Sequence, residues 1–494
     1  MTKRAWSVAT VLALACAPAP AAHAAAPNWS TRTLSWGTNT YGQLGDASDE
    51  TRTTPVPVRS VLARFTQVAA GYEHTVALAK DGTVWAWGRN DDGQVGDHAA
   101  DPVRTPARVP GLTGVTQVAA GWSGSLALRS DGTVWAWGVY PFLGDGTQAS
   151  RGVPAPVPGL TGVVEIAAKG SHVLARRTDS TVWGWGRNAE GQLGDGTFTR
   201  RLSPVRVPSL GGVVSIAVSK YHSLAAREDG SVWAWGNSTY GWDGSSYGGE
   251  LRTPVQVTGA PKIVKVAAGY DHSLALDASG RLWAWGRNDK GQRGDGTLTT
   301  PHNPGAPRPV PALTQVTAIT AGRRTSAALS GGNVYTWGGN SAGQMGDGNA
   351  PAARPTPAIV PGVGPAIGVT AGMGDGHLLA VQADPPPAPP GATLTVQPES
   401  VTVNAGRSAT ATVLVEPING LTESLKLTAA GLPSGVTVTF DPPLVPPGQT
   451  SVMTVTAGPD APIRSETVTV HGYDSSRTSL ASTTFDLTVS GPIE

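Results

Sequence analysis

The sequence is poor in charge, in cysteine and in long apolar runs. Only 14% of its 494 residues are charged, and 36 Lys and Arg against 35 Asp and Glu leave a formal net charge of +1. Without a bulk positive field, nucleic acid and anionic lipid are not expected partners. A single cysteine, Cys16, excludes a disulfide scaffold. No stretch reaches the roughly 18 apolar residues of a spanning helix, so we expect no integral membrane segment.

Glycine, proline and tryptophan are the residues in excess. The chain has 64 Gly and 41 Pro, which interrupt helices too often for a helical bundle. Sixteen Trp outnumber the 9 Tyr and 5 Phe together. A hydrophobic content of 39% is enough to form packed cores. The composition therefore predicts an all-β protein made of many short strands.

The first residues have the pattern of an export signal. A basic start with Lys3 and Arg4 precedes a short apolar run, and Ala22-His23-Ala24 matches the A-x-A cleavage pattern. We interpret residues 1–24 as a signal peptide and expect an exported protein, whether secreted, periplasmic or at the cell surface. The alternative is a lipoprotein signal with Cys16 acylated. Cleavage after Ala24 leaves no cysteine, so packing alone stabilises the mature protein.

A tetrapeptide W-x-W-G recurs about every fifty residues. It is complete in five copies, from Trp85-Ala86-Trp87-Gly88 to Trp283-Ala284-Trp285-Gly286, and degenerate in two. The second tryptophan stands at 36, 87, 137, 185, 235, 285 and 337. Such regularity over seven copies indicates an internal repeat.

Each repeat carries enough strand and turn signals for four short strands. A segment such as Ala69-Ala70-Gly71 precedes each full motif, a turn such as Asp81-Gly82 separates the two, and a Gly-rich stretch follows. Four strands make one propeller blade. The first W-G copy lacks a preceding Ala-Ala-Gly segment, and the last such segment lacks a following W-G copy. We therefore predict a seven-bladed β-propeller over residues 28–383, closed by strands from both ends.

The repeated tryptophans are predicted to pack the blades together. Strand alternation places both Trp of a motif on one face and small residues on the other, so neighbouring blades nest. The residues given this structural role are Trp85, Trp87, Trp135, Trp137, Trp183, Trp185, Trp233, Trp235, Trp283, Trp285 and Trp337, with Trp36 in the first copy.

Together, A-A-G-x-x-H-S-L-A-L, D-G-x-V-W-x-W-G and G-Q-L-G-D-G-T resemble the repeats of the regulator of chromosome condensation family. The resemblance implies a seven-bladed propeller that serves as a platform for other macromolecules. The eukaryotic namesake is an exchange factor for the GTPase Ran and binds chromatin, and a secreted bacterial member inhibits β-lactamase with one propeller face. The signal peptide and the neutral charge argue against exchange activity here.

The last hundred residues differ in composition from the repeats. A proline-rich linker is expected over 384–391, and beyond it tryptophan is absent and Thr, Val and Ser dominate. About eight runs of period two follow, separated by turn residues. This pattern predicts an immunoglobulin-like β-sandwich over 392–494, similar to the Ig-like domains of exported bacterial proteins.

Histidine recurs at one position of the repeat and raises the question of a metal. The five residues are His74, His172, His222, His272 and His377. Imidazoles converging in a ring could bind zinc or copper. The interpretation we favour is structural, with each histidine bonded to backbone within its own blade. No nucleophile, phosphate-loop or calcium-loop motif is complete, so we expect no enzyme, no cofactor and no metal.

The two residues before the histidine position are the most variable and are predicted to form a rim of loops. Tyr, Trp and Arg, which are enriched at binding hot spots, occur there. The candidate binding residues are Tyr72, Trp122, Lys220, Tyr221, Tyr270, Arg323 and Arg324, to which we add Trp242, which lies outside the W-x-W-G copies. The alternative is that these side chains fill gaps between blades. We expect a monomer that binds a protein or other macromolecule there, with enzyme inhibition and adhesion as other functions.

Overall fold

The computed structural model describes residues 33–59, 63–96, 101–239, 249–299, 306–374, 376–383 and 390–492. Within these ranges the chain forms strands and turns, with no helix. Consequently none of the described residues form a helix that could cross a membrane. The chain divides into two compact units between Ala383 and Asp384. The predicted signal peptide at 1–24, with Cys16, lies outside the described residues.

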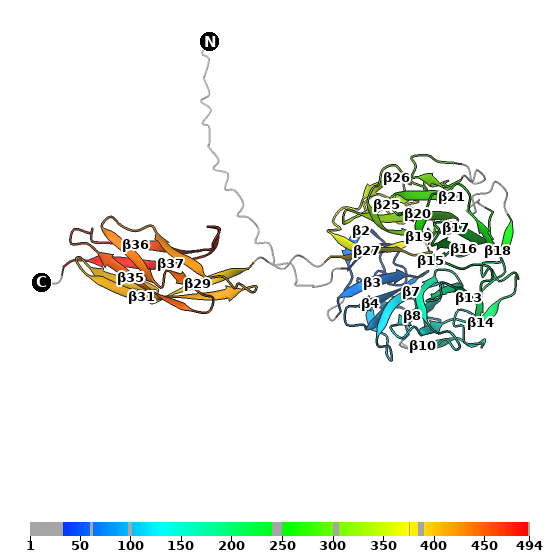
Figure 1. The fold of residues 1–494 in the computed structure, drawn as a ribbon, viewed down its shortest axis with the longest axis horizontal. Helices are drawn as coiled ribbons and strands as arrows, with labels where there is room; N and C mark the ends of the chain where they lie inside the picture. Colours follow the sequence, from blue (N-terminus) through cyan, green and yellow to red (C-terminus); the bar gives the residue numbers. More distant parts are fainter. Residues whose placement is uncertain are drawn as a thin grey trace, which may run out of the picture. The chain divides into compact units, whose positions relative to one another are not determined.

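The first unit consists of seven four-stranded antiparallel sheets that follow one another around a common centre (Figure 1). Six of them contain consecutive strands. The first three are β3 (Phe65–Ala70), β4 (His74–Ala79), β5 (Val84–Gly88) and β6 (Val103–Arg108); β7 (Val115–Ala120), β8 (Gly124–Arg129), β9 (Val134–Gly138) and β10 (Arg151–Pro156); and β11 (Val163–Ala168), β12 (His172–Arg177), β13 (Val182–Gly186) and β14 (Arg201–Arg206).

The next three sheets repeat the same order. They are β15 (Val213–Val218), β16 (His222–Arg227), β17 (Val232–Asn237) and β18 (Glu250–Gln256); β19 (Ile263–Ala268), β20 (His272–Asp277), β21 (Leu282–Gly286) and β22 (Arg308–Pro309); and β23 (Val316–Ala321), β24 (Thr325–Ser330), β25 (Asn333–Gly338) and β26 (Arg354–Ile359). The predictions of an all-β chain and of repeated four-stranded blades are confirmed.

The seventh sheet joins the two ends of the repeat array. Its order is β2 (Arg52–Pro57), β1 (Thr33–Gly37), β28 (His377–Gln382) and β27 (Ala366–Ala371). β1 and β28 pair over five residues, with Leu34 opposite Ala380 and Trp36 opposite Leu378. The backbone groups that would be an exposed edge at each end of the array are therefore satisfied by each other.

The hairpin between the second and third strands of a blade is fixed by a short polar turn. In the first complete blade Gly82 has a φ of +80°, a conformation that suits glycine. The Asp81 carboxylate accepts bonds from the backbone N–H (3.0 Å) and the hydroxyl (2.7 Å) of Thr83. The same Asp-to-hydroxyl arrangement recurs at Asp131, Asp179 and Asp229. These local bonds set the hairpin register on which the tryptophan positions depend.

The second tryptophan of each motif forms the core between two blades. Trp137 is fully buried and packs against Val84 and Ala86, the small-residue face of the preceding blade. Trp87 packs in the same way against Leu379 and Val381 of the closing sheet. The first tryptophan of each motif is only half-buried. The two indoles of a motif therefore contribute unequally to the interior.

The second unit contains two sheets that share one hydrophobic core. One sheet has β29 (Gly391–Gln397), β31 (Ser408–Ile418), β35 (Thr450–Ala457) and β33 (Val436–Asp441). The other has β30 (Ser400–Asn404), β37 (Ser479–Ser490), β36 (Arg464–Tyr473), β32 (Leu425–Ala430) and β34 (Leu444–Val445), with β30 parallel to β37. β29 begins at Gly391, inside the predicted linker. Similarity to an immunoglobulin domain stays a prediction.

The unequal tryptophans give a direct test of the packing. Trp137 Nε1 donates to the backbone oxygen of Gln94 (2.9 Å), whereas Trp135 Nε1 is buried without a hydrogen-bond partner. Trp137→Phe loses a buried bond and leaves a cavity, so we expect a destabilisation of about 2 kcal/mol or more in urea unfolding. The matched Trp135→Phe removes an unpaired N–H and should change stability by less than about 1 kcal/mol. Equal losses would contradict the assignment.

Candidate binding face and central channel

Seven of the predicted rim residues, all except Trp242, lie in the loops that leave the innermost strands. Each loop connects the first and second strands of a blade, as β3 to β4 or β19 to β20. Backbone bonds join several of these loops to the next blade: Tyr72 N–H donates to Gly121 O (3.1 Å), Trp122 N–H to Gly170 O (2.9 Å) and Tyr270 N–H to Gly322 O (3.1 Å). These bonds hold the three loops against the next blade, so their side chains have fixed neighbours.

Two aromatic side chains from adjacent blades stack in this ring. Tyr72 and Trp122 have ring centroids 4.0 Å apart and planes 15° from parallel. Both side chains are half-buried. Stacked aromatic pairs of this kind supply rigid apolar surface. The stack therefore fills the gap between the blades and stays partly exposed.

Lys220 links the stack to a second aromatic pair. Its Nζ lies 4.6 Å from the Trp122 ring centroid, 5.0 Å from that of Tyr221 and 5.3 Å from that of Tyr270. The Tyr221 and Tyr270 hydroxyls are 3.1 Å apart, and Nζ donates to the Tyr270 hydroxyl (3.2 Å). Burial acts to lower the pKa of Lys220, but the bonds to these hydroxyls outweigh it and raise the pKa. Lys220 is therefore a stable cation at neutral pH.

The reach of Lys220 depends on a glycine in the intervening blade. Trp122 belongs to the blade of β7–β10 and Lys220 to that of β15–β18, and between them the equivalent position is Gly170. With no side chain at Gly170, the lysine spans the blade and lies over Trp122. Beyond Tyr270, the Arg323 guanidinium lies 5.7 Å from the tyrosine ring centroid. We call Tyr72, Trp122, Lys220, Tyr221, Tyr270 and Arg323 the collar.

A basic hollow of about 450 Å³ adjoins the collar at Arg323. Lys290 and the exposed Arg324 also line it, together with the polar side chains of Asn340 and Ser341. The structure therefore places seven of the eight candidate rim residues on one face and joins six of them through ring contacts. The eighth, Trp242, lies outside the described residues.

The five repeated histidines are fully buried, and four of them contact a hydroxyl in the next blade at 3.1 Å or less. His74 Nε2 is 3.0 Å from Ser125 Oγ, His172 Nε2 is 2.8 Å from Ser223 Oγ, and His272 Nε2 is 2.8 Å from Ser326 Oγ. In the closing sheet His377 Nε2 is 3.1 Å from Thr75 Oγ1, and His222 Nε2 lies 3.4 Å from Ser273 Oγ. The expectation of a backbone bond within the histidine's own blade is not met at Nε2, because the ring reaches across to the neighbouring sheet. His222 Nδ1 in addition lies 2.8 Å from Ser219 Oγ of its own blade.

The hydroxyl that contacts the histidine donates its own hydrogen bond to a backbone carbonyl. Ser125 Oγ donates to the Gln94 oxygen at 2.8 Å, so it must accept from a protonated His74 Nε2. Each histidine thus contacts a different hydroxyl group, and the five imidazoles do not converge on one metal site. Within the described ranges no group of three or more His, Cys, Asp or Glu could hold a metal ion.

In the blade of β7–β10 two residues replace the histidine and the loop glutamine. Gly124 takes the histidine position, and Phe142 takes that of the loop glutamine. A Cβ added at Gly124 would collide with the Phe142 ring, which is fully buried. The phenyl ring therefore fills the volume that the imidazole occupies in other blades, a compensation that the sequence analysis missed.

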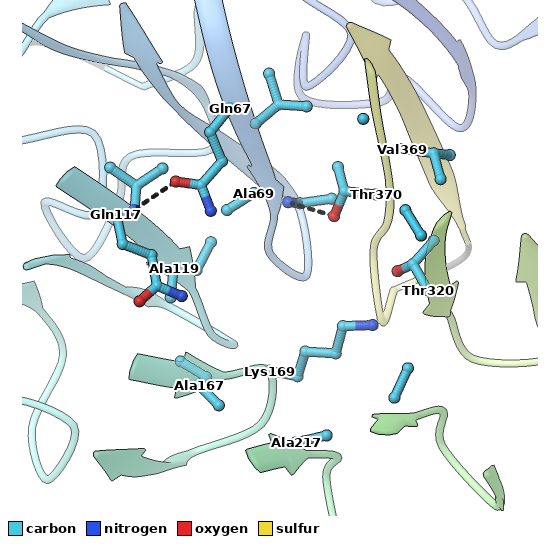
Figure 2. Close-up of a pocket in the computed structure, with 18 of the residues that line it drawn as sticks. Gln67, Ala69, Gln117, Ala119, Ala167, Lys169, Ala217, Thr320, Val369 and Thr370 are labelled. Atoms are coloured by element: carbon cyan, nitrogen blue, oxygen red, sulfur yellow. Dashed lines mark hydrogen bonds between the residues drawn. The ribbon is translucent and has the colours of Figure 1, made fainter. Parts of the chain in front are cut away.

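The central channel contains a residue that the sequence analysis also missed. The innermost strands β3, β7, β11, β15, β19, β23 and β27 enclose a cavity of about 400 Å³. Lys169 extends into it from the end of β11 (Figure 2). Its Nζ donates to Ala321 O of β23. Burial lowers the pKa of Lys169 to about 8. An alignment of the repeats could have identified this residue, because Lys169 occupies a position held by glycine in most blades.

Seven nested sheets closed by both chain ends, with a collar of loop side chains around one channel mouth, define a β-propeller. The RCC1-like domain model matches residues 32–380, and the chain belongs to this family. The predicted RCC-type propeller is thereby confirmed. The family assignment covers the first unit, and the second unit lies beyond the matched range.

Solved structures support the same assignment. Yeast RCC1 (Prp20) bound to Kap60 is 25% identical, with a TM-score of 0.64, over 71% of this chain and 89% of that one. Human WBSCR16 is 25% identical, with a TM-score of 0.62, over 71% and 98%. The ultraviolet-B receptor UVR8 of Arabidopsis thaliana is 33% identical over 82 residues, 16% of this chain and 19% of the receptor. The probable E3 ubiquitin-protein ligase HERC4 of Homo sapiens is 41% identical over 76 residues, 15% and 7%. The alignments thus span less than a fifth of either relative.

The buried histidines predict an acid-sensitive propeller. Burial lowers the pKa of His74, His172 and His272 to about 3, while an unfolded histidine titrates near 6.5. Below pH 6.5 the unfolded chain binds more protons, so each histidine removes up to about 1.4 kcal/mol of stability per pH unit. Asp271, whose pKa burial raises to about 6, has the opposite sign and offsets about one of them.

Urea unfolding between pH 6.5 and pH 5 measures this slope. In the double variant His74→Gln/His272→Gln, the part of the pH slope of the unfolding free energy that comes from the histidines should be smaller by about two fifths. This holds whatever the stability of the variant at pH 7. An unfolding free energy of the wild-type protein that does not change over this range would contradict the buried neutral state.

Proposed function

We propose that this protein is exported and that its propeller binds another protein through the collar, as a monomeric scaffold without catalytic activity. The collar carries the proposal, because it is a continuous run of aromatic and cationic side chains on one face. Aromatic and arginine side chains contribute most of the energy at many protein interfaces. Relatives of the same fold support a binding role, since a second Prp20 structure, from Saccharomyces cerevisiae, is described with its binding to Gsp1p and histones.

The preformed geometry of the collar favours affinity. Backbone bonds between blades position the loops, and Lys220 fixes the orientation of three rings. A ligand that packs on Trp122 and Tyr270 would therefore order few side chains on binding, which reduces the entropic cost. Half-buried rings also keep one surface available for contact.

The basic hollow beside the collar indicates the charge of the partner. Arg323 belongs to both features, and Lys290 and Arg324 add two more cations. The nearby carboxylates of Asp271 and Asp289 are already paired with Arg287, at 3.2 and 2.7 Å. We therefore propose a partner that places an aromatic or aliphatic side chain on the collar and an acidic side chain in the hollow.

Affinity capture tests the proposal. Residues 25–494 serve as bait for the secreted and envelope proteins of the source organism, with the variant Trp122→Ala/Tyr270→Ala alongside. Because each aromatic anchor contributes about 2 kcal/mol or more at an interface, the captured partner should be lost from the double variant. Arg324→Ala should weaken capture chiefly at low salt, as expected for steering by charge.

A matched control removes apolar surface elsewhere. Val264 and Ile367 are 47% and 56% exposed and lie on the innermost strands β19 and β27. Val264→Ala/Ile367→Ala should retain the partner, with all variants checked by thermal melting. Retention of the partner by the Trp122/Tyr270 variant at wild-type level would reject the collar as the binding face.

A further inference from the structure

Lys169 occupies a position where the other blades carry a small residue. Three residues before the histidine or its replacement, the chain has Gly71, Gly121, Gly269 and Gly322, with Gly372 and Ser219 in the remaining blades. A Cβ on Gly71 would lie 2.7 Å from His74 Nδ1, and one on Gly269 would lie 2.5 Å from His272 Nδ1. A large side chain is therefore disfavoured at this position of the repeat. The packing that the blades share does not explain why one of them has a lysine there.

Small apolar side chains form part of the wall of the cavity around Lys169. Ala69, Ala119, Ala167, Ala217 and Val369 line it from five different blades (Figure 2). No carboxylate is among the described residues that line it. Such walls suit an aliphatic group, because covering them removes apolar surface from water on both partners.

The polar side chains of the channel are largely committed to joining the blades. Gln67 Oε1 accepts the Val118 N–H at 3.0 Å, and Gln117 forms two bonds of 2.9 Å with the Ile166 backbone. Thr320 and Thr370 hydroxyls accept N–H groups of the next strand in the same manner. These side chains replace the ladder bonds that two neighbouring innermost strands cannot form.

The Lys169 ammonium, by contrast, has more N–H donors than acceptors in the structure. It carries three N–H groups, and the structure gives it one acceptor, the Ala321 carbonyl. No Asp or Glu in the described part of the chain forms an ion pair with it within 4.0 Å. Lys169 is half-buried, and a partly desolvated cation without an anionic partner is unfavourable, so a ligand that brings the negative charge would stabilise it.

We propose that the central channel binds a small aliphatic carboxylate, with its carboxylate on Lys169 Nζ and its hydrocarbon part against the alanine walls. The ligand enters from the mouth opposite the collar. There a second hollow of about 630 Å³ shares Thr66, Gln67, Gln117 and Lys265 with the channel. Lys265 is exposed and attracts anions to this mouth. Glu165, at the same mouth, is paired with Arg176 at 2.7 Å. The site shares no residue with the collar.

Calorimetric titration of the full mature chain with sodium hexanoate tests the proposal. We expect saturable binding to the wild-type protein and at least about a tenfold loss of affinity in Lys169→Met, which keeps the length of the side chain but not its charge. Lys426→Met, the same change at an exposed lysine of the second unit, should bind within about threefold of wild type. Hexanamide, which has the same chain without the charge, should not bind.

A second measurement avoids any effect of the substitution on folding. Reductive ¹³C-methylation of the wild-type protein keeps the charge of each lysine, and the Lys169 signal is assigned by its absence in Lys169→Met or Lys169→Gln. Hexanoate should shift the Lys169 methyl resonance and leave that of Lys220 in place. A Lys169 resonance that does not respond, or hexanoate affinity unchanged in Lys169→Met, overturns the proposal and leaves the lysine as a strut between β11 and β23.

Discussion

The propeller depends on a backbone carbonyl in the Gly-rich loop that accepts the indole N–H of the next blade and, at Gln43, Gln94, Gln192 and Gln292, a hydroxyl from that blade as well. The Gln94 oxygen accepts the Trp137 indole N–H and the Ser125 hydroxyl, and the Gln192 oxygen accepts the equivalent pair from Trp235 and Ser223. The loop itself is tied down, since Asn90 Oδ1 accepts the Val95 N–H at 2.9 Å. A buried carbonyl with two strong donors fixes both the distance and the register between sheets, so the collar and the channel inherit their geometry from this contact.

The ring could be predicted from the sequence because its determinants recur. The tryptophan positions gave the number of blades, and the unequal ends of the array indicated closure, now seen as Trp36 opposite Leu378. Contacts between repeats were harder to foresee. A hydroxyl follows the histidine position at Thr75, Ser125 and Ser223, a recurrence that would have pointed to a partner in the next blade. Repetition within one chain does not show which residue faces which across a gap.

The collar and Lys169 illustrate what a single repeat alignment leaves out. Lys220 reaches Trp122 only because Gly170 is bare, so the contact depends on three different blades. Lys169 stands out for a related reason: one blade departs from a rule that six others obey. In a repeat protein the shared residues build the scaffold, and the exceptions are the positions to examine for ligands. Collar and channel are both built from such exceptions.

The closing sheet combines strands from both ends of the repeat array, and this affects when it can form during synthesis. β1 and β2 are synthesised first, yet their partners β28 and β27 are made only after every other blade. Until then β1 has no neighbour on one side and Trp36 lacks Leu378 beside it. Pairing between segments so distant in sequence is entropically slow. A chain that ends before β28 therefore keeps unpaired backbone N–H and C=O groups along β1. Only a chain with the whole repeat array can pair them and close the ring.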